Sequence, residues 1–390
     1  MVQRLDTWLD QAAQQREAGS RVRRRRPLKP VDAVRVHDGD RVLVNFSGND
    51  YLGLSGHPEV VAAAVNTLQS GTCGAGASAL VTGYRPEHQA LEARLAQFLE
   101  RESVVLFSSG FLANLAVASS LTARRDTIVQ DRLCHASLID GARLSGARLL
   151  RYAHLDTAAA GRQLSRAGEG NALLVTDGIF SMDGDVAPLA DLARACGQAG
   201  AWMVVDDAHG FGVTGPGGRG VVASAGLSQE ENPVLVGTLG KACGSAGAFV
   251  AGSRALVEHL VNEARSYIYT TAMPPAVAAA GLAGLERVIA DGWRREKLRE
   301  LTGLFREGAA AMGWRLLPSQ TPIQPLLTET SEMALRLAEA LRARGFLVVA
   351  IRPPTVPEGG ARLRVTFSAA HETGHVEKLL EALEECRDNL

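Results

Sequence analysis

Short apolar stretches alternate with longer stretches of helical periodicity along most of the chain. The apolar stretches are rich in valine and leucine and lack polar alternation, which is typical of strands buried on both faces. Helix-length segments such as Glu87–Glu100, Phe111–Ala123 and Leu189–Ala199 lie between several of them. This alternation predicts an α/β fold with helices on both faces of a mostly parallel sheet. The predicted strands are Val42–Phe46, Val104–Phe107, Thr127–Val129, Leu149–Tyr152, Leu173–Thr176, Trp202–Val205, Val234–Gly237 and Ala248–Ala251.

A different pattern begins after Pro274 and Pro275, which interrupt the chain. A long helical region is expected over Ala276–Met312, and a final helix presents one apolar face from Val376 onwards. The elements expected between them are the strand Ile323–Leu327, the helix Ser331–Arg344 and the strands Phe346–Ile351 and Arg362–Phe367. We predict three parts: an N-terminal amphipathic helix and arm (1–45), a large domain (46–275) and a smaller C-terminal α/β domain (276–390).

The composition excludes several classes of protein. Of the 390 residues, 46% are hydrophobic and 21% are charged, which suffices for a large core. The formal net charge of −1 gives no overall field that attracts nucleic acid or membrane. No apolar run approaches the roughly 20 residues that a spanning helix needs. The five cysteines are scattered without metal-binding spacing, so we expect free thiols, no metal site and a reducing, cytoplasmic location.

Lysine is rare in this chain, and one of the four lysines stands out. Lys241 lies in TLGKACG, just after the apolar stretch Val234–Gly237 and among small residues, whereas Lys29, Lys297 and Lys378 lie in charged segments. Enclosure by small residues removes water from the amine, which lowers its pKa from the usual value of about 10.4. Such a lysine is typical of a functional site.

Other polar residues also follow predicted strands, where ligands bind in sheets of this kind. Asp206 and His209 follow one strand, and His135 and Ser181 follow two others. The segment FSSG (107–110) precedes a predicted helix, whose first N–H groups favour an anion such as phosphate. Taken singly, each has an ordinary alternative: a helix cap for Asp206, a core or loop position for His135, and a plain strand–helix turn for FSSG.

Pyridoxal 5′-phosphate (PLP) is a cofactor that uses all of these residue types at once. It needs a lysine for a Schiff base, an acid facing the ring nitrogen, a partner for the ring face and a nest for the phosphate. Lys241, Asp206 and His135 supply the first three types, and FSSG supplies the fourth. The combination therefore predicts a PLP site.

Three further patterns suggest other functions. Gly215, Gly217 and Gly220 fit a dinucleotide-binding motif, which would indicate a nicotinamide oxidoreductase, but no buried strand precedes them. HETGH (371–375) fits a zinc-protease motif, but Gly374 interrupts it where the last helix begins. The run RVRRRRP (21–27) could belong to an arginine-rich binding protein, but no interleaved aromatic residues accompany it.

From about residue 20 to its C-terminus the chain resembles the α-oxoamine synthase family of fold-type I PLP enzymes. The resemblance implies a large domain with a mostly parallel seven-stranded sheet and a smaller C-terminal α/β domain. IRPPTVPEGGARLRVTFSAAHE is similar to the branch of the family that makes 8-amino-7-oxononanoate for biotin. The other segments that carry the resemblance are NDYLGLSGHPEV, FSSGFLAN, DRLCHASLIDG, TDGIFSMDGD, VDDAHGFG, TLGKACG and YIYTTAMPPA.

The resemblance also implies roles for individual residues. Lys241 would hold the cofactor and move the α-proton, Asp206 would pair with the ring nitrogen, and His135 would stack on the ring. The other implied cofactor contacts are Ser181, His209, Thr238 and the backbone of Gly110 and Phe111. The implied substrate contacts are Arg364, which would bind the amino acid carboxylate, together with Arg23, His135 and Thr355.

The implied reaction joins L-alanine to a pimeloyl thioester with loss of CO2. The acyl carrier would be acyl carrier protein or coenzyme A. The implied assembly is a homodimer in which Thr270–Thr271 reach the partner's cofactor. A sister synthase that uses glycine with acetyl- or succinyl-CoA is the alternative. The chain departs from the family pattern at Gly48, Ala79 and Asp177, and Ala79 bears on the acyl chain accepted.

Overall fold

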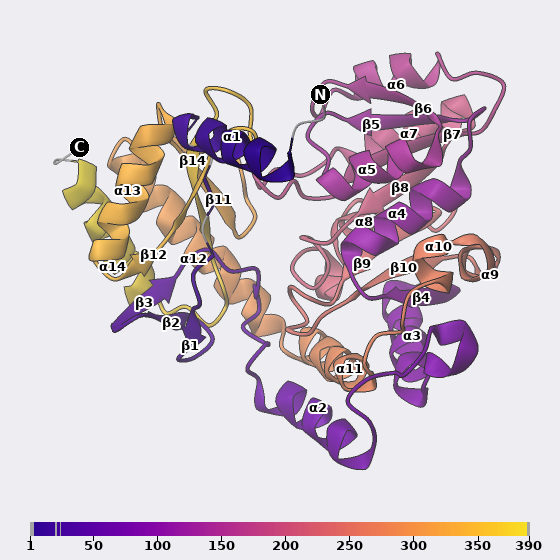
Figure 1. Ribbon diagram of the computed structural model, residues 1–390, viewed down its shortest axis with the longest axis horizontal. Helices are drawn as coiled ribbons and strands as arrows, with labels where there is room; N and C mark the ends of the chain where they lie inside the picture. Colours follow the sequence, from indigo (N-terminus) through magenta and orange to yellow (C-terminus); the bar gives the residue numbers. More distant parts are fainter. Residues whose placement is uncertain (1–3, 20–21, 24, 388–390) are drawn as a thin grey trace.

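A seven-stranded sheet forms the core of the larger part of the molecule, on the right in Figure 1. The computed structural model describes residues 4–19, 22–23 and 25–387. The strands follow the order β4-β10-β9-β8-β7-β5-β6, and only β10 runs antiparallel to its neighbours. The predicted mostly parallel sheet is therefore confirmed. The strands span Ser103–Phe107 (β4), Thr127–Asp131 (β5), Arg148–Tyr152 (β6), Ala172–Asp177 (β7), Trp202–Asp206 (β8), Val234–Thr238 (β9) and Ala248–Gly252 (β10).

Helices cover both faces of this sheet. Successive strand side chains point to opposite faces, so each strand supplies two separate apolar layers. In β8, Val204 packs in the layer that contains α4, α5 and α9, whereas Met203 and Val205 pack in the layer that contains α3, α6, α7 and α11. The helices span Pro58–Ser70 (α2), Pro86–Leu99 (α3), Gly110–Leu121 (α4), Ala136–Ser145 (α5), Thr157–Leu164 (α6), Leu189–Ala199 (α7), Val221–Ser224 (α8), Arg254–Glu263 (α9), Arg265–Ile268 (α10) and Pro275–Ala290 (α11).

The carboxyl ends of the parallel strands meet at one edge of the sheet. Asp177, at the end of β7, pairs in register with Asp206, at the end of β8. Asp131 ends β5, and Thr238 ends β9. Because β10 returns antiparallel to β9, the connection between them stays at this edge and carries Lys241. The sheet topology thus collects the polar residues that follow the strands.

The C-terminal part forms a three-stranded sheet, β11-β14-β13, with α12, α13 and α14 packed nearby (Figure 1). The expected continuous helical region over Ala276–Met312 is in fact two helices. Asp291 has a non-helical backbone, φ −95° and ψ 58°, and Gly292 follows it; both residue types are poor helix formers. The elements span Gly292–Ala311 (α12), Ile323–Leu327 (β11), Ser331–Ala343 (α13), Val349–Ile351 (β13), Arg362–Thr366 (β14) and Thr373–Arg387 (α14).

The expected single strand over Phe346–Ile351 is wrong, because it divides between two sheets. Phe346–Leu347 (β12) joins a four-stranded sheet, β1-β2-β3-β12, while β13 pairs with β14. The Ser47 hydroxyl bridges the break: it donates to Leu347 O at 3.3 Å and accepts from Val349 N at 2.9 Å. The remaining strands of this sheet are Lys29–Pro30 (β1), Arg35–Asp38 (β2) and Arg41–Asn45 (β3).

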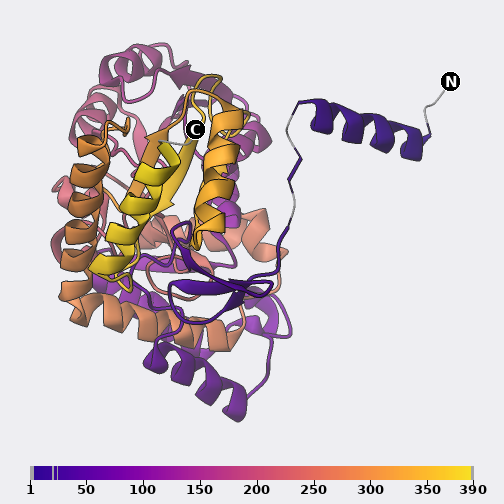
Figure 2. The ribbon, with the colours of Figure 1, turned by 90° about the vertical axis from the view of Figure 1, so that its left-hand side faces the viewer.

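The N-terminal helix α1, Leu5–Ala18, extends away from the rest of the molecule (Figure 2). The predicted helix is present, but its apolar residues Leu5, Trp8 and Leu9 are exposed. The division into parts 1–45, 46–275 and 276–390 stays a prediction; β3 and β12 pair across the first and last of these parts. Across residues 4–19, 22–23 and 25–387, none of the helices is both long and apolar enough to cross a membrane.

Candidate active site

Lys241 lies beside His209 at the carboxyl edge of the sheet. Its Nζ is 2.8 Å from His209 Nε2. Burial lowers the pKa of Lys241 to about 8, although the charges of Asp206 and Asp177 act in the opposite direction. The lowered pKa expected from the sequence is therefore confirmed, and roughly a tenth of the amine is neutral at pH 7.

Asp206 is 6% exposed and is held at the end of β8 by two hydrogen bonds. Its Oδ2 accepts from Asn114 Nδ2 at 2.6 Å, and its Oδ1 accepts from Ala208 N at 3.0 Å. Asn114 is buried in α4 and also donates to Ser137 Oγ at 2.9 Å. The carboxylate position is thus fixed from two sides, which suits a charge that must face one defined atom.

His135 precedes α5, and its ring is exposed. Its Nδ1 lies 2.7 Å from Ser137 Oγ, and its backbone N–H donates to Asp177 Oδ2 at 2.8 Å. Desolvation lowers the pKa of His135 more than the charge of Asp206 raises it. Ser137 therefore links the ring of His135 to Asn114, the residue that holds Asp206.

A chain of hydrogen bonds connects Lys241 to Arg364. His209 Nδ1 lies 2.7 Å from Tyr51 Oη. Arg364, on β14 and 7% exposed, donates from Nη2 to Tyr51 Oη at 3.5 Å and from Nε to Ser181 O at 2.6 Å. Burial, with the charges of Lys241 and Arg364, keeps the pKa of His209 well below its ordinary value. His209 is thus neutral between an amine and a guanidinium.

The start of α4 offers backbone N–H groups to an anion. Ser109 caps the helix by accepting from Leu112 N at 3.3 Å, and a side chain at Gly110 would meet only open space. The first N–H groups of a helix, here those of Gly110 and Phe111, have no partner within the helix. The Thr238 hydroxyl donates to Gly247 O at 2.9 Å and accepts from Gly240 N at 3.2 Å, so it shapes the turn that carries Lys241.

These groups fit the chemistry of PLP. Lys241 supplies an amine of lowered pKa, and Asp206 supplies a fixed carboxylate. His135 supplies an exposed aromatic face, and α4 supplies an open helix start. The individual roles of these residues remain predictions.

Two other sets of residues named from the sequence lie close together in space. Arg23 Nη2 donates to Thr355 Oγ1 at 3.2 Å, which joins two substrate candidates from opposite ends of the chain. Among the described residues, no hydrogen bond or ion pair joins Arg23 or Thr355 directly to Lys241. Ala79 and Thr270–Thr271 line one small cavity of about 30 Å³. Part of the arginine run, residues 21 and 24, lies outside the described residues.

The two competing motifs have local structural roles. Gly215 precedes the short 3₁₀ turn Pro216–Gly218 (η2), and the motif ends just before α8, with no strand leading into it. His371 Nδ1 accepts from Ser368 N at 2.9 Å, and His375 Nδ1 accepts from Glu372 N at 3.1 Å. Within the described ranges, no group of three or more His, Cys, Asp or Glu side chains could hold a metal ion.

The sequence prediction missed several residues that hold the site in place. Asn114 and Ser137 support Asp206 and His135, and Tyr51 joins His209 to Arg364. Asn114 had a signal, because it is the one amide in the apolar helix sequence GFLANLAVASSL. Tyr51 had no such signal, because its contact partner His209 lies 158 residues away in the sequence.

Comparison with known proteins gives matches over nearly the whole chain. The family model described as aminotransferase class I and II matches residues 41–383. A protein of Stutzerimonas stutzeri named 8-amino-7-oxononanoate synthase is 54% identical over 93% of this chain and 93% of its own. The protein of the same name from Cellvibrio japonicus is 50% identical over 99% of this chain and 97% of its own.

Solved structures share the fold. Serine palmitoyltransferase of Sphingomonas wittichii matches with a TM-score of 0.95 at 29% identity, covering 99% of both chains. A structure of serine palmitoyltransferase with PLP matches with a TM-score of 0.94 at 27% identity, also over 99% of both chains. The 8-amino-7-oxononanoate synthase of Francisella tularensis matches with a TM-score of 0.77 at 32% identity, over 89% of this chain and 98% of that one. The predicted fold-type I architecture is therefore confirmed.

Proposed function

The chain belongs to the 8-amino-7-oxononanoate synthase family of PLP-dependent acyltransferases, and from this membership we propose that it condenses L-alanine with a pimeloyl thioester. PLP is its cofactor. The observation that supports the proposal is the run of hydrogen bonds Lys241–His209–Tyr51–Arg364, because it joins a buried amine to a buried guanidinium, the two groups that the proposed roles require. The choice of alanine and a pimeloyl thioester is what the resemblance to synthases that make 8-amino-7-oxononanoate implies.

The bonds exchanged follow from these substrates. The α-carbon of alanine bonds to the thioester carbonyl carbon, and the carbon–sulfur bond breaks to release the carrier thiol. The bond to the alanine carboxylate then breaks to release CO2, and a proton returns to the α-carbon. When bound, PLP supplies an aldehyde that links to an amine and a ring that withdraws electrons from the α-carbon.

The side chains divide the remaining tasks. Lys241 holds the cofactor at rest, and its free amine then takes the α-proton and later returns one; a pKa of about 8 suits both directions. Asp206 keeps a proton on the ring nitrogen by its negative charge. His135 would hold the ring face of the cofactor, and Ser181, His209, Thr238 and the start of α4 would supply the other cofactor contacts. Arg364 binds the alanine carboxylate through its guanidinium, of which Nε and Nη2 are already oriented by Ser181 O and Asn49 Oδ1.

We further propose a homodimer, with Thr270–Thr271 beside the partner's cofactor. Leu80, Val81 and Tyr269 are exposed near these threonines, which supports a contact surface there. Arg23 and Thr355 are assigned to the pimeloyl substrate, since a guanidinium and a hydroxyl suit its distal carboxylate. The acyl donor is carried by acyl carrier protein or coenzyme A, and the expected location is the cytoplasm.

The test of this function is a substrate comparison with the PLP-loaded enzyme. We expect 8-amino-7-oxononanoate, detected by mass spectrometry, from alanine with a pimeloyl thioester. Glycine with acetyl-CoA or succinyl-CoA should react at least about 100-fold more slowly in kcat/KM, the range expected when a pocket is shaped for another ligand. Pimeloyl-CoA and pimeloyl-acyl carrier protein are compared in parallel. A preference for glycine would refute the proposed substrates.

The Lys241 pKa predicts how the apoenzyme takes up PLP. Only the neutral amine attacks an aldehyde, and burial lowers the Lys241 pKa to about 8. The rate of uptake, followed by visible absorbance, should therefore rise about tenfold per pH unit below pH 8 and level off above it. A rate that keeps rising to a midpoint near pH 10 would contradict the lowered pKa.

A further inference from the structure

The loop of residues 180–185 (the 180–185 loop) follows β7 and is held mainly by residues of the C-terminal part. Arg364, the proposed substrate-binding arginine, depends on this loop, because its Nε donates to Ser181 O at 2.6 Å. The other contacts made from the C-terminal part are Arg362 Nη1 with Met182 O and Asp183 Oδ1, and the Ser319 and Thr321 hydroxyls with Gly184 O. The loop therefore holds the Nε side of the guanidinium, while Asn49 Oδ1 and Tyr51 Oη accept from Nη2 at 3.3 and 3.5 Å.

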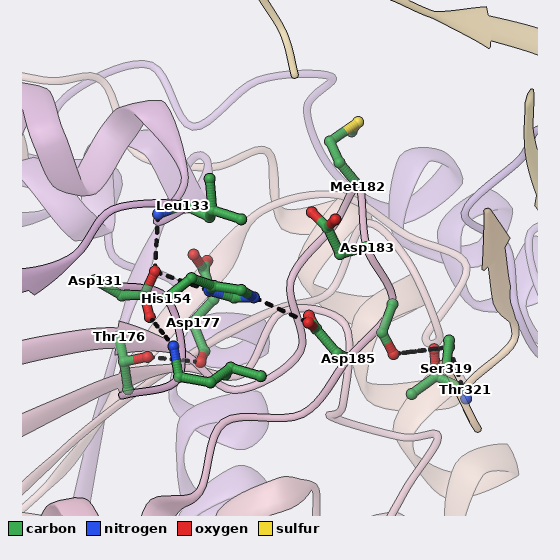
Figure 3. A network of polar contacts seen from close by, with 12 residues as sticks. Asp131, Leu133, His154, Thr176, Asp177, Met182, Asp183, Asp185, Ser319 and Thr321 are labelled. Carbon is green, nitrogen blue, oxygen red and sulfur yellow. Dashed lines mark hydrogen bonds and ion pairs between the residues drawn. The ribbon is translucent and has the colours of Figure 1, made fainter. Parts of the chain in front are cut away.

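His154 holds the same loop from the side of the large sheet (Figure 3). Its Nε2 lies 2.9 Å from Asp185 Oδ2, and its Nδ1 lies 3.0 Å from Asp131 Oδ1. Asp185 in turn closes the loop, since Phe180 N donates to Asp185 O at 3.0 Å. The edge of the His154 ring also packs on Phe180, with centroids 4.4 Å apart. His154 thus spans from the end of β5 to the base of the loop.

Asp131 gives His154 a rigid anchor. It is 1% exposed and accepts from Leu133 N at 2.8 Å and from Leu155 N at 2.9 Å. Leu155 has a φ of +58°, a left-handed conformation that residues other than glycine rarely adopt. Such a conformation persists where the surroundings enforce it, and here the bond to Asp131 fixes the turn that carries His154.

The imidazole is charged at neutral pH. Burial alone would lower the pKa of His154, but its hydrogen bonds to Asp131 and Asp185 and their charges outweigh burial and raise the pKa to about 10. Asp185 Oδ1 is buried and has no hydrogen-bond partner in the described structure. The carboxylate of Asp185 is therefore stabilised through Oδ2, by the His154 cation.

We propose that His154 is a positioning residue for the substrate carboxylate: through Asp185 it fixes the 180–185 loop, and Ser181 O then orients Arg364. The inference rests on the proposed function, in which Arg364 binds the carboxylate of the amino acid. The contacts of His154 are with Asp131, Asp185 and Phe180, none of which is assigned to substrate or cofactor. His154 contacts the 180–185 loop on the side of the large sheet, whereas Arg364 contacts it from the C-terminal part, so the effect of His154 on amino acid affinity is transmitted through the loop.

The test is the variant His154→Gln, studied as the PLP-loaded enzyme. Alanine binding is measured by the change in visible absorbance on titration, which requires no acyl donor. We expect the Kd of alanine to rise about tenfold, since small displacements of a binding group have effects of this order, while kcat falls less than about threefold. His259→Gln is the matched control, because His259 is exposed and contacts Ser120 O on another face; its Kd should match the wild type.

Two comparisons separate positioning from general destabilisation. Arg364→Ala should weaken alanine binding, and adding His154→Gln to it should have no further effect, because the two changes act on one contact. Ethylamine, which lacks a carboxylate, should bind equally to the wild type and to His154→Gln. If His154→Gln does not fold, Asp185→Asn is used in the same cycle.

The proposal fails if His154→Gln binds alanine like the wild type, weakens ethylamine equally, or weakens alanine further in the Arg364→Ala background. Failure of the proposed function appears differently. The wild type would then bind alanine but form no 8-amino-7-oxononanoate with either pimeloyl thioester, whatever the His154 variant does.

Discussion

Lys241→Ala should fold and bind PLP without a covalent link, yet lose turnover by about 10⁴-fold. The change removes the amine that holds the cofactor and moves the α-proton, and a general base alone contributes up to about 10⁴-fold. It leaves the strands around it intact, because Thr238, not Lys241, makes the side-chain bonds that shape this turn. Turnover is measured as 8-amino-7-oxononanoate formed per active site.

Borohydride labelling provides the second measurement for this variant. The wild type should carry the reduced cofactor on Lys241 after digestion and mass spectrometry, and Lys241→Ala should carry none. Lys378→Ala is the matched control, since Lys378 is exposed on α14, and it should keep full activity and labelling. A small amine such as methylamine should partly restore proton transfer in Lys241→Ala. Multiple turnover by Lys241→Ala at the wild-type rate would contradict the catalytic role assigned to Lys241.

The hydrophobic pattern of short segments predicted the strands of the large sheet. The apolar runs at β8 and β9 are buried on both faces, so each gave a clear strand. The failure at Phe346–Ile351 has a physical cause, because the same extended backbone pairs first with β3 and then with β14. The Ser47 contacts that separate the two pairings come from about 300 residues away, which no local pattern contains.

In the candidate site, too, some residues could be predicted from local sequence and others could not. Asp206 ends β8 and Lys241 lies three residues after β9, and the sheet topology brings such positions to one edge. Tyr51 and His154 act through partners distant in the sequence. Their function becomes visible only when the loops are placed in space. Asn114 was accessible in principle, because a buried amide in an apolar helix requires a partner.

Asp206, which ends β8, and Asp207, which follows it, differ in their surroundings. Asp206 faces Asn114 and the cofactor side. Asp207 is 1% exposed, and its Oδ2 accepts from Val221 N at 2.7 Å on the opposite side. Burial raises the pKa of Asp207 well above its ordinary value, so its neutral form is favoured. We therefore expect the charge of Asp206, and not that of Asp207, to serve the cofactor.

Asp206→Asn should therefore lower kcat by about 10³-fold, the upper range for loss of one preorganised electrostatic group. The amide preserves the shape of the side chain but no longer keeps a proton on the ring nitrogen, so the α-proton becomes harder to remove. Asp207→Asn, the matched control, should keep kcat within about threefold, and its thermal stability is measured in parallel because Asp207 is buried. Both variants are loaded with PLP and assayed with alanine and pimeloyl thioester. Equal losses in the two variants would show that burial, and not the charge at Asp206, limits the reaction.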